Sequence, residues 1–236
     1  MVRSTLQFIF ASAAIFVLVC SGFAQSASQF EPQEDRVKVE ITTTFGVMTL
    51  ELFNETPLHR DNFVRLVNEG FYDGLLFHRV MKDFMIQGGD PKSKEAPTGA
   101  RLGSGGPGYT IPKEIDSRFV HVKGALCAAR QPDRVNPEFA SSGSQFYLAQ
   151  GRITSPNQLA TFASRITEST GEPFAYMPDQ VEAYSRLGGT AFLDMNYTVF
   201  GQVTQGLEVI DAVTTAVVDK SNRPLEDVVM SIRVLK

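Results

Sequence analysis

Apolar and polar residues alternate in short runs along most of the chain from residue 37 onward. The runs 37–41 and 48–52 place apolar side chains at every second position, on either side of Phe45 and Gly46. Because successive side chains of a strand point to opposite faces of a sheet, each run predicts a half-buried strand. The short connection between the runs predicts an antiparallel hairpin.

Six further segments have the length and composition of strands. They are 75–80, 84–87, 124–129, 145–149, 198–203 and 228–235. Eight short strands, with helices only near the two ends, predict a mainly β fold: a closed eight-stranded antiparallel β-barrel capped by two α-helices. Closure is expected because it removes the exposed edges of a sheet. A β-sandwich is the alternative architecture.

The two capping helices are predicted from apolar spacing and from residues that start or stop a helix. The first begins after Thr56, which can cap it, buries apolar residues of 63–67, and ends near Gly70. The second is a short amphipathic helix at about 207–213. Each has one apolar face, so both helices are expected to pack on the barrel.

The segment of about 152–187 interrupts the strand pattern. Ser155 and Gln158 have the spacing of a capping box, and the apolar residues of 159–166 share one face of the helix that follows. A second helix is predicted at 179–187. We interpret the pair as a helical insertion beside the barrel.

The N-terminus has a different composition from the rest of the chain. Arg3 precedes an apolar stretch at 6–19, which is shorter than the about 20 residues that a membrane span needs. Gly22 and Ala24 then place small residues at the positions that signal peptidase accepts. These features predict a signal peptide at 1–24, removed after Ala24.

Downstream of that cut, a flexible polar lead-in at 25–35 precedes one folded domain at 36–236. An uncleaved anchor and lipid attachment at Cys20 are the alternatives, although a lipoprotein-type cut favours a smaller residue than Val19. Without the leader, Cys127 has no partner for an internal disulfide. Its small apolar neighbours predict a buried, inert thiol.

Charge and motif content exclude several classes of function. The formal net charge is -4 and no run of basic residues occurs, so nucleic acid is not an expected partner. The sequence contains no nucleophile elbow and no P-loop, and the glycines of 103–108 predict a bent surface loop. His59, His78 and His121 are far apart in sequence and are interpreted as structural or solvated. We therefore expect neither a metal nor a cofactor.

The most distinctive segment is 77–90, which combines an arginine within an aromatic strand, a Phe-Met pair, a glutamine and a double glycine. Three further blocks follow in order, at 124–130, at 143–147, and at 192–194 with 199–201. Together the four blocks resemble the signature of the cyclophilins, a family of peptidylprolyl cis-trans isomerases. The resemblance covers about 35–236 outside the insertion.

This resemblance implies the residues of an active site. It makes Arg79 the catalytic residue, and it assigns substrate binding to Phe84, Met85, Gln87, Ala129, Arg130, Gln145, Tyr147, Phe192, Leu193 and Tyr197. The apolar members would hold a proline ring, and Gln87 would bind the substrate carbonyl. The backbone of Ala129 and Arg130 would pair with the peptide as an added strand does, and Gln145 would support Arg79.

The chemistry of amide rotation supports the role of Arg79 independently. Rotation is opposed by a barrier of about 18–20 kcal/mol, because resonance gives the bond partial double-bond character. A catalyst can lower this barrier by binding the twisted amide better than either planar form. A guanidinium aimed at the prolyl nitrogen would do so by stabilising its localised lone pair.

Four positions differ from the best-known eukaryotic members. Phe192 stands where many carry tryptophan, Tyr147 where they carry phenylalanine, Tyr197 where they carry histidine, and Arg130 where they carry asparagine. These changes preserve an aromatic pocket. Together with the leader, they indicate a bacterial exported member, with the periplasm as its compartment.

Two other functions remain open at this stage. A proline-peptide-binding module or holding chaperone without catalysis would need the groove but not Arg79. A structural envelope protein could use the helices at Leu159 and Val181 to dock a partner, although these helices could equally pack on the barrel. The isomerase hypothesis predicts proline-containing peptides and unfolded exported proteins as partners. It also predicts a monomer without a membrane span after leader removal, and an insertion that is separable from the catalytic surface.

Overall fold

The computed structural model describes Met1 and residues 35–236 of the chain. The predicted signal peptide after Met1 and the predicted lead-in up to residue 34 lie outside the described residues. Within the described part, no helix combines the length and the apolar character needed to cross a membrane.

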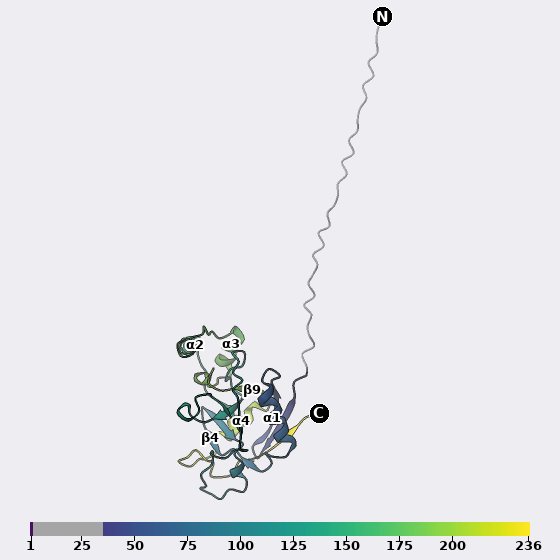
Figure 1. The fold of residues 1–236 in the computed structure, drawn as a ribbon, viewed down its shortest axis with the longest axis vertical. Helices are drawn as coiled ribbons and strands as arrows, with labels where there is room; N and C mark the ends of the chain where they lie inside the picture. Colours follow the sequence, from purple (N-terminus) through teal and green to yellow (C-terminus); the bar gives the residue numbers. More distant parts are fainter. Residues whose placement is uncertain (2–34) are drawn as a thin grey trace. The chain divides into compact units, whose positions relative to one another are not determined.

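One antiparallel sheet of ten strands forms the centre of the described part (Figure 1). Its strands are β1 (Lys38–Thr43), β2 (Gly46–Leu52), β3 (Leu75–Leu76), β4 (Arg79–Met81), β5 (Met85–Gly88), β6 (Thr110–Ile111), β7 (Ala125–Arg130), β8 (Ser141–Ala149), β9 (Val199–Gln205) and β10 (Val229–Val234). Their order is β3-β10-β1-β2-β9-β7-β8-β5-β4, with β6 paired to β8. The two end strands are separated along the chain only by Phe77 and His78. The sheet therefore curls round until its two edges come together, which confirms the predicted mainly β, cyclophilin-like architecture.

The sheet differs from the prediction in its details. It has ten strands instead of eight, because the segment 75–80 divides into two and the short β6 adds to β8. The division occurs where the backbone leaves β10: the N–H of Phe77 donates to Val228 O, whereas the N–H of Val80 donates to Asn222 O, both at 2.9 Å. As a result β3 and β4, which are neighbours along the chain, are the first and last strands of the sheet.

β1 and β2 form the predicted hairpin. Val39 pairs with Leu50 and Ile41 pairs with Met48, and all four side chains are fully buried. Gly46 lies at the turn with a φ of 135°, a conformation that residues with a β-carbon rarely adopt. The alternating pattern in the sequence therefore corresponds to one buried face of the sheet.

Helices α1 (Pro57–Asn68) and α4 (Leu207–Val213) are the two predicted capping helices. Their inward residues share one hydrophobic core with the strands: Phe63, Leu66 and Val67 from α1, and Val209, Ile210 and Val213 from α4. Both helices are visible near β9 in Figure 1. Their apolar faces explain why they pack on the sheet.

The N-terminus of α1 is capped by a distant residue and not by Thr56. Thr56 occupies the N-cap position, but its side chain makes no capping hydrogen bond. The carboxylate of Glu114 accepts hydrogen bonds from the backbone N–H groups of Leu58 and His59 at 3.0 and 2.9 Å. Burial acts to raise the pKa of Glu114, but the contacts with His59 and Leu58 lower it overall. An anion at a helix N-terminus is favourable because it meets unpaired N–H groups and the positive end of the helix dipole.

The insertion forms two helices, α2 (Pro156–Thr170) and α3 (Pro178–Arg186), which lie together at one end of the sheet (Figure 1). The predicted capping box is confirmed: the Ser155 side chain accepts from the N–H of Gln158, whose side chain accepts from the N–H of Ser155. α3 begins one residue earlier than predicted. Leu159 and Tyr184 are buried against Val120 and Ala191, so the insertion packs on the rest of the domain.

Three short 3₁₀ turns complete the described elements: η1 (Pro91–Ser93), η2 (Asp133–Val135) and η3 (Ala191–Leu193). Cys127 in β7 is fully buried and forms no disulfide within the described residues, which confirms the predicted buried thiol.

Candidate active site

A pocket of about 110 Å³ opens beside β4, β5, β7 and β8. It is lined by Arg79, Phe84, Met85, Gln87, Ala129, Arg130, Tyr147, Leu193 and Tyr197. All nine belong to the set of eleven residues that the sequence assigned to the site. The other two lie beside the pocket, Gln145 behind Gln87 and Phe192 with its ring 5.7 Å from that of Phe84.

The base of the pocket is apolar. Met85, Ala129 and Tyr147 are buried in one hydrophobic cluster, and Phe84, Leu193 and Tyr197 pack against that cluster from the pocket rim. Such a small, mostly apolar cavity beside a few polar groups is typical of a ligand site.

Arg79 stands at the polar side of this pocket. The pairing of β4 with β5 places it directly opposite Gln87, so both side chains project from the same face of the sheet. Arg79 Nη1 donates to Gln87 Oε1 at 3.2 Å, and its guanidinium lies 5.7 Å from the centre of the Phe84 ring. Burial lowers the pKa of Arg79 from its ordinary value, yet a guanidinium stays charged throughout the physiological range.

Two glutamines extend this contact into a chain of hydrogen bonds. Gln87 Nε2 donates to Gln145 Oε1 at 3.0 Å, and Gln145 Nε2 donates to the backbone oxygen of Gly105 at 2.7 Å. Because a primary amide has distinct donor and acceptor ends, this chain fixes the orientation of both amides. Gln145 thus acts on Arg79 through Gln87.

The glycine loop that the sequence predicted at 103–108 forms part of a larger groove beside the pocket. This groove measures about 760 Å³ and shares Gln87, Ala129 and Arg130 with the pocket. Asp90 holds the loop in place, because its carboxylate accepts hydrogen bonds from the N–H groups of Gly103 and Gly105 at 2.5 and 3.2 Å. The signature segment therefore organises both the pocket and the loop.

The side chain of Arg130 is engaged within the protein. Its guanidinium lies 4.3 Å from the centre of the Phe139 ring and 4.6 Å from that of Tyr197, and its Nε donates to Asn196 O at 2.9 Å. Ala129 lies at an irregularity in the pairing of β7 with β8, beyond the last residue of β7 that pairs with β9.

Comparison with known proteins identifies the family to which this site belongs. The family model described as cyclophilin type peptidyl-prolyl cis-trans isomerase/CLD matches residues 38–234. The chain belongs to this family. A putative peptidyl-prolyl cis-trans isomerase of Staphylococcus aureus (strain COL) is 35% identical over 204 residues, which cover 85% of this chain and 92% of that protein. A relative with the same description in Staphylococcus epidermidis is 33% identical over 204 residues, with the same coverage.

Solved structures share the fold of this cyclophilin. A crystal structure of a cyclophilin type peptidyl-prolyl cis-trans isomerase of Cryptosporidium parvum matches with a TM-score of 0.57 at 22% identity, covering 86% of this chain and 99% of that one. A second structure of that isomerase, in the presence of the dipeptide Ala-Pro, matches with a TM-score of 0.54 at 22% identity, covering 84% and 99%. This protein is therefore a cyclophilin-type peptidyl-prolyl cis-trans isomerase in family and in fold.

The aromatic side of the pocket rests on a buried histidine. The Tyr147 hydroxyl lies 2.9 Å from His121 Nε2, and His121 Nδ1 lies 2.8 Å from Asp194 Oδ1. The backbone N–H of His121 also donates to that oxygen, at 2.7 Å. Tyr197 completes the arrangement, with its ring 5.9 Å from Tyr147 and nearly perpendicular to it.

The surroundings of His121 raise its pKa. Burial is the largest influence and lowers the pKa of His121, but Cys127 and Asp194 together raise it to about 10. This shift favours the imidazolium, in which both ring nitrogens are donors, Nδ1 toward Asp194 and Nε2 toward the Tyr147 oxygen. Burial also raises the pKa of Tyr147 well above its ordinary value, which keeps this phenol neutral.

Sequence reasoning missed this buried group. It interpreted His121 as structural or solvated, and it used Asp194 only as part of a motif for the pocket wall. The contact between them joins residues 73 positions apart in the chain. The sequence offers one indication of this pair: His121 and Asp194 each lie in a segment that is otherwise mainly apolar.

The expectation that the insertion is separable from the catalytic surface stays a prediction, but hydrogen bonds join the insertion to a residue next to the pocket. The hydroxyls of Tyr176 and Tyr184, both within the insertion, donate to Asp194. Asp194 directly follows Leu193, which lines the pocket. The insertion is therefore part of the structure behind this pocket.

Proposed function

We propose that Arg79 is the catalytic residue of this isomerase and that the adjoining pocket holds the substrate proline. The main support is geometric: a half-buried guanidinium, oriented by Gln87, stands at the side of an otherwise apolar pocket. A proline ring fits such a pocket, and the amide nitrogen next to the ring would then lie near the cation. The second N–H of the Gln87 amide would bind the substrate carbonyl.

The physical basis is preferential stabilisation of the twisted amide. When the Xaa-Pro bond rotates, resonance is lost and the lone pair becomes localised on nitrogen. A preorganised cationic donor stabilises that state more than it stabilises the planar ground state, and such groups commonly contribute about 3–4 kcal/mol. No covalent bond is made or broken, so no nucleophile or cofactor takes part in the proposed mechanism.

The test is to replace Arg79 and to measure kcat/KM on an Ala-Pro peptide alongside peptide affinity. Arg79→Ala should reduce turnover by a factor of order 10² to 10³, while peptide binding falls far less. Arg79→Lys should restore only part of the activity, because an ammonium keeps the charge but not the planar fork. Arg233→Ala is the matched control, since Arg233 is an exposed arginine paired with Glu40 on another strand.

The outcome also separates catalysis from mere binding. Near-normal turnover in folded Arg79→Ala would remove Arg79 from the mechanism. Peptide binding without any isomerase activity in the unaltered protein would favour a proline-peptide-binding module or a holding chaperone.

We further propose that this isomerase assists the folding of exported proteins. The support is the apolar leader of residues 1–24 and its small residues before the expected cut after Ala24. Unfolded exported proteins with exposed Xaa-Pro bonds are the proposed clients, and the periplasm is the proposed compartment. N-terminal sequencing of protein from envelope fractions should find Gln25 first; retained Met1, or an acylated Cys20, would overturn this proposal.

A further inference from the structure

Asp194 is the centre of a buried polar cluster that the proposed catalytic mechanism does not use. It is 1% exposed. One carboxylate oxygen binds His121, and the other accepts hydrogen bonds from the hydroxyls of Tyr176 and Tyr184 at 2.8 and 2.7 Å. A buried carboxylate is stable only when its oxygens are paired in this way, so each donor matters to its position.

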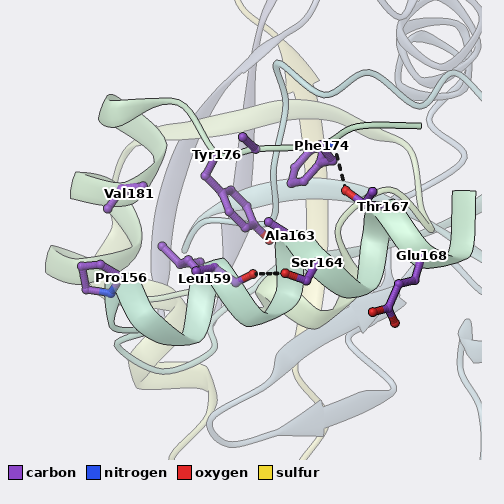
Figure 2. A pocket seen from close by; sticks show the side chains of 11 residues that line it. Pro156, Leu159, Ala163, Ser164, Thr167, Glu168, Phe174, Tyr176 and Val181 are labelled. Atoms are coloured by element: carbon purple, nitrogen blue, oxygen red, sulfur yellow. Dashed lines mark hydrogen bonds between the residues drawn. The ribbon is translucent and has the colours of Figure 1, made fainter. Parts of the chain in front are cut away.

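Both tyrosines come from the insertion. Tyr184 lies on α3 and is fully buried, and Tyr176 lies between α2 and α3 with its ring 5.7 Å from that of Tyr184. Figure 2 shows Tyr176 lying beside α2, where it lines a pocket of about 540 Å³ together with Leu159 and Val181. The insertion is thereby fixed to the domain by apolar packing and by two hydrogen bonds to one carboxylate.

The same carboxylate connects to the proline pocket by two routes. Through His121 it reaches the hydroxyl of Tyr147, whose ring lines the pocket. Through the backbone it is joined to Leu193, which lines the pocket on the adjacent side. A displacement of Asp194 would thus move two walls of the same cavity.

We propose that the insertion positions the aromatic wall of the proline pocket, with Tyr176 and Tyr184 acting through Asp194 and His121 on Tyr147. These residues are positioning residues, because none of the insertion residues lines the pocket. The inference rests on the proposed assignment of this pocket as the substrate site.

The expected effect is on substrate binding more than on turnover. Tyr147 would hold the proline ring in both the planar and the twisted states, so a change in its placement alters binding in both states alike. Loss of such uniform binding raises KM and leaves kcat unchanged. Arg79, in contrast, is expected to act mainly on kcat.

The experiment uses Tyr184→Phe and Tyr176→Phe in the full chain, each of which removes one hydroxyl and keeps the ring. We expect each variant to weaken affinity for an Ala-Pro peptide by about three- to tenfold, with kcat within about twofold of the unaltered protein. Thr167→Val is the control, because the Thr167 hydroxyl accepts from Phe174 N within the insertion, at 3.0 Å, without touching Asp194 (Figure 2). This control should leave peptide affinity within about twofold, since the network to Tyr147 stays intact.

A double-mutant cycle tests the route of the effect. Tyr147→Phe removes the hydroxyl at the pocket end, so Tyr184→Phe should have less than about twofold further effect on affinity in that background. An equal effect of Tyr184→Phe in both backgrounds would overturn the route through His121. An unchanged peptide affinity in both insertion variants, with only a lower melting temperature, would show that the cluster is structural and would overturn the proposal.

Failure of the pocket assignment would look different. In that case Arg79→Ala would keep near-normal turnover. Failure of the coupling alone would leave the effect of Arg79→Ala in place, and Tyr147→Phe, Tyr176→Phe and Tyr184→Phe would each leave peptide affinity unchanged.

Discussion

The two sides of the proline pocket are held in different ways. The polar side consists of Arg79, Gln87 and Gln145, which project from neighbouring strands and form a chain that ends on a backbone oxygen. The aromatic side rests on His121 and Asp194, which are almost fully buried and ion-paired. On the first side Arg79 and Gln87 are partly exposed and Gln145 is buried, whereas on the second side both members of the pair lie inside the protein.

Because of this difference, substitutions on the two sides should affect catalysis and the stability of the fold to different degrees. The partly exposed amide of Gln87 can lose a hydrogen-bond partner and find water instead, so changes at Arg79 or Gln87 should affect catalysis with little loss of stability. A buried charge that loses its partner has no such replacement. Changes on the aromatic side should therefore destabilise the fold and alter the pocket together.

The largest expected effect is that of removing the buried carboxylate. Asp194→Ala would leave a buried imidazolium and two buried hydroxyls without their acceptor, and we expect a loss of about 3–5 kcal/mol in the free energy of unfolding. Urea denaturation measures this directly. Glu40→Gln, which alters an exposed ion pair with Arg233, should be nearly neutral. Equal stability of the two variants would show that the buried pair contributes little.

The second prediction concerns pH. The pKa of His121 is raised from 6.5 to about 10 in the folded protein, so this group stabilises the fold fully below about pH 6.5. That contribution should be lost as pH rises from about 6.5 to about 10, at no more than about 1.4 kcal/mol per pH unit. Denaturation of the unaltered protein and of His121→Gln across this range gives the test, and the variant should show the smaller slope. An identical slope in both would assign the pH dependence to another group.

On the polar side, Gln145→Leu should reduce kcat/KM by about tenfold, because Gln87 loses the acceptor that orients its amide. The free energy of unfolding should fall less in Gln145→Leu than in Asp194→Ala. The test measures kcat/KM and urea denaturation on the same preparation of each variant. A large loss of stability with normal activity would reverse the assignment of the two sides.

The smallest expected effect lies at the rim. Phe192 is 55% exposed and packs near Phe84. The resemblance to cyclophilins implies that a tryptophan at this position donates a hydrogen bond to cyclosporin, and phenylalanine has no such donor. Phe192→Trp should therefore tighten inhibition several-fold, by about 1 kcal/mol. An inhibition titration that superimposes on that of the unaltered protein would contradict this role.

Local spacing in the sequence was enough to predict the elements whose hydrogen bonds close within a few residues. The hairpin at Gly46 and the capping box of Ser155 with Gln158 both depend on neighbours in the chain, and both are present. The resemblance of four sequence blocks to the cyclophilins, with the segment around Arg79 as the most distinctive, assigned the residues that line the pocket. There, two adjacent strands in register place residues eight positions apart opposite one another.

Only the tertiary structure decided the contacts between distant segments. Thr56 satisfies the sequence rule for a helix cap, yet Glu114, more than fifty residues away, makes the hydrogen bonds. The contact of His121 with Asp194, 73 residues apart, likewise depends on where the sheet places these segments. A residue type reveals what a side chain can bind, but the partner of a buried charge is set by the fold that brings the two together, because burial makes that pairing necessary.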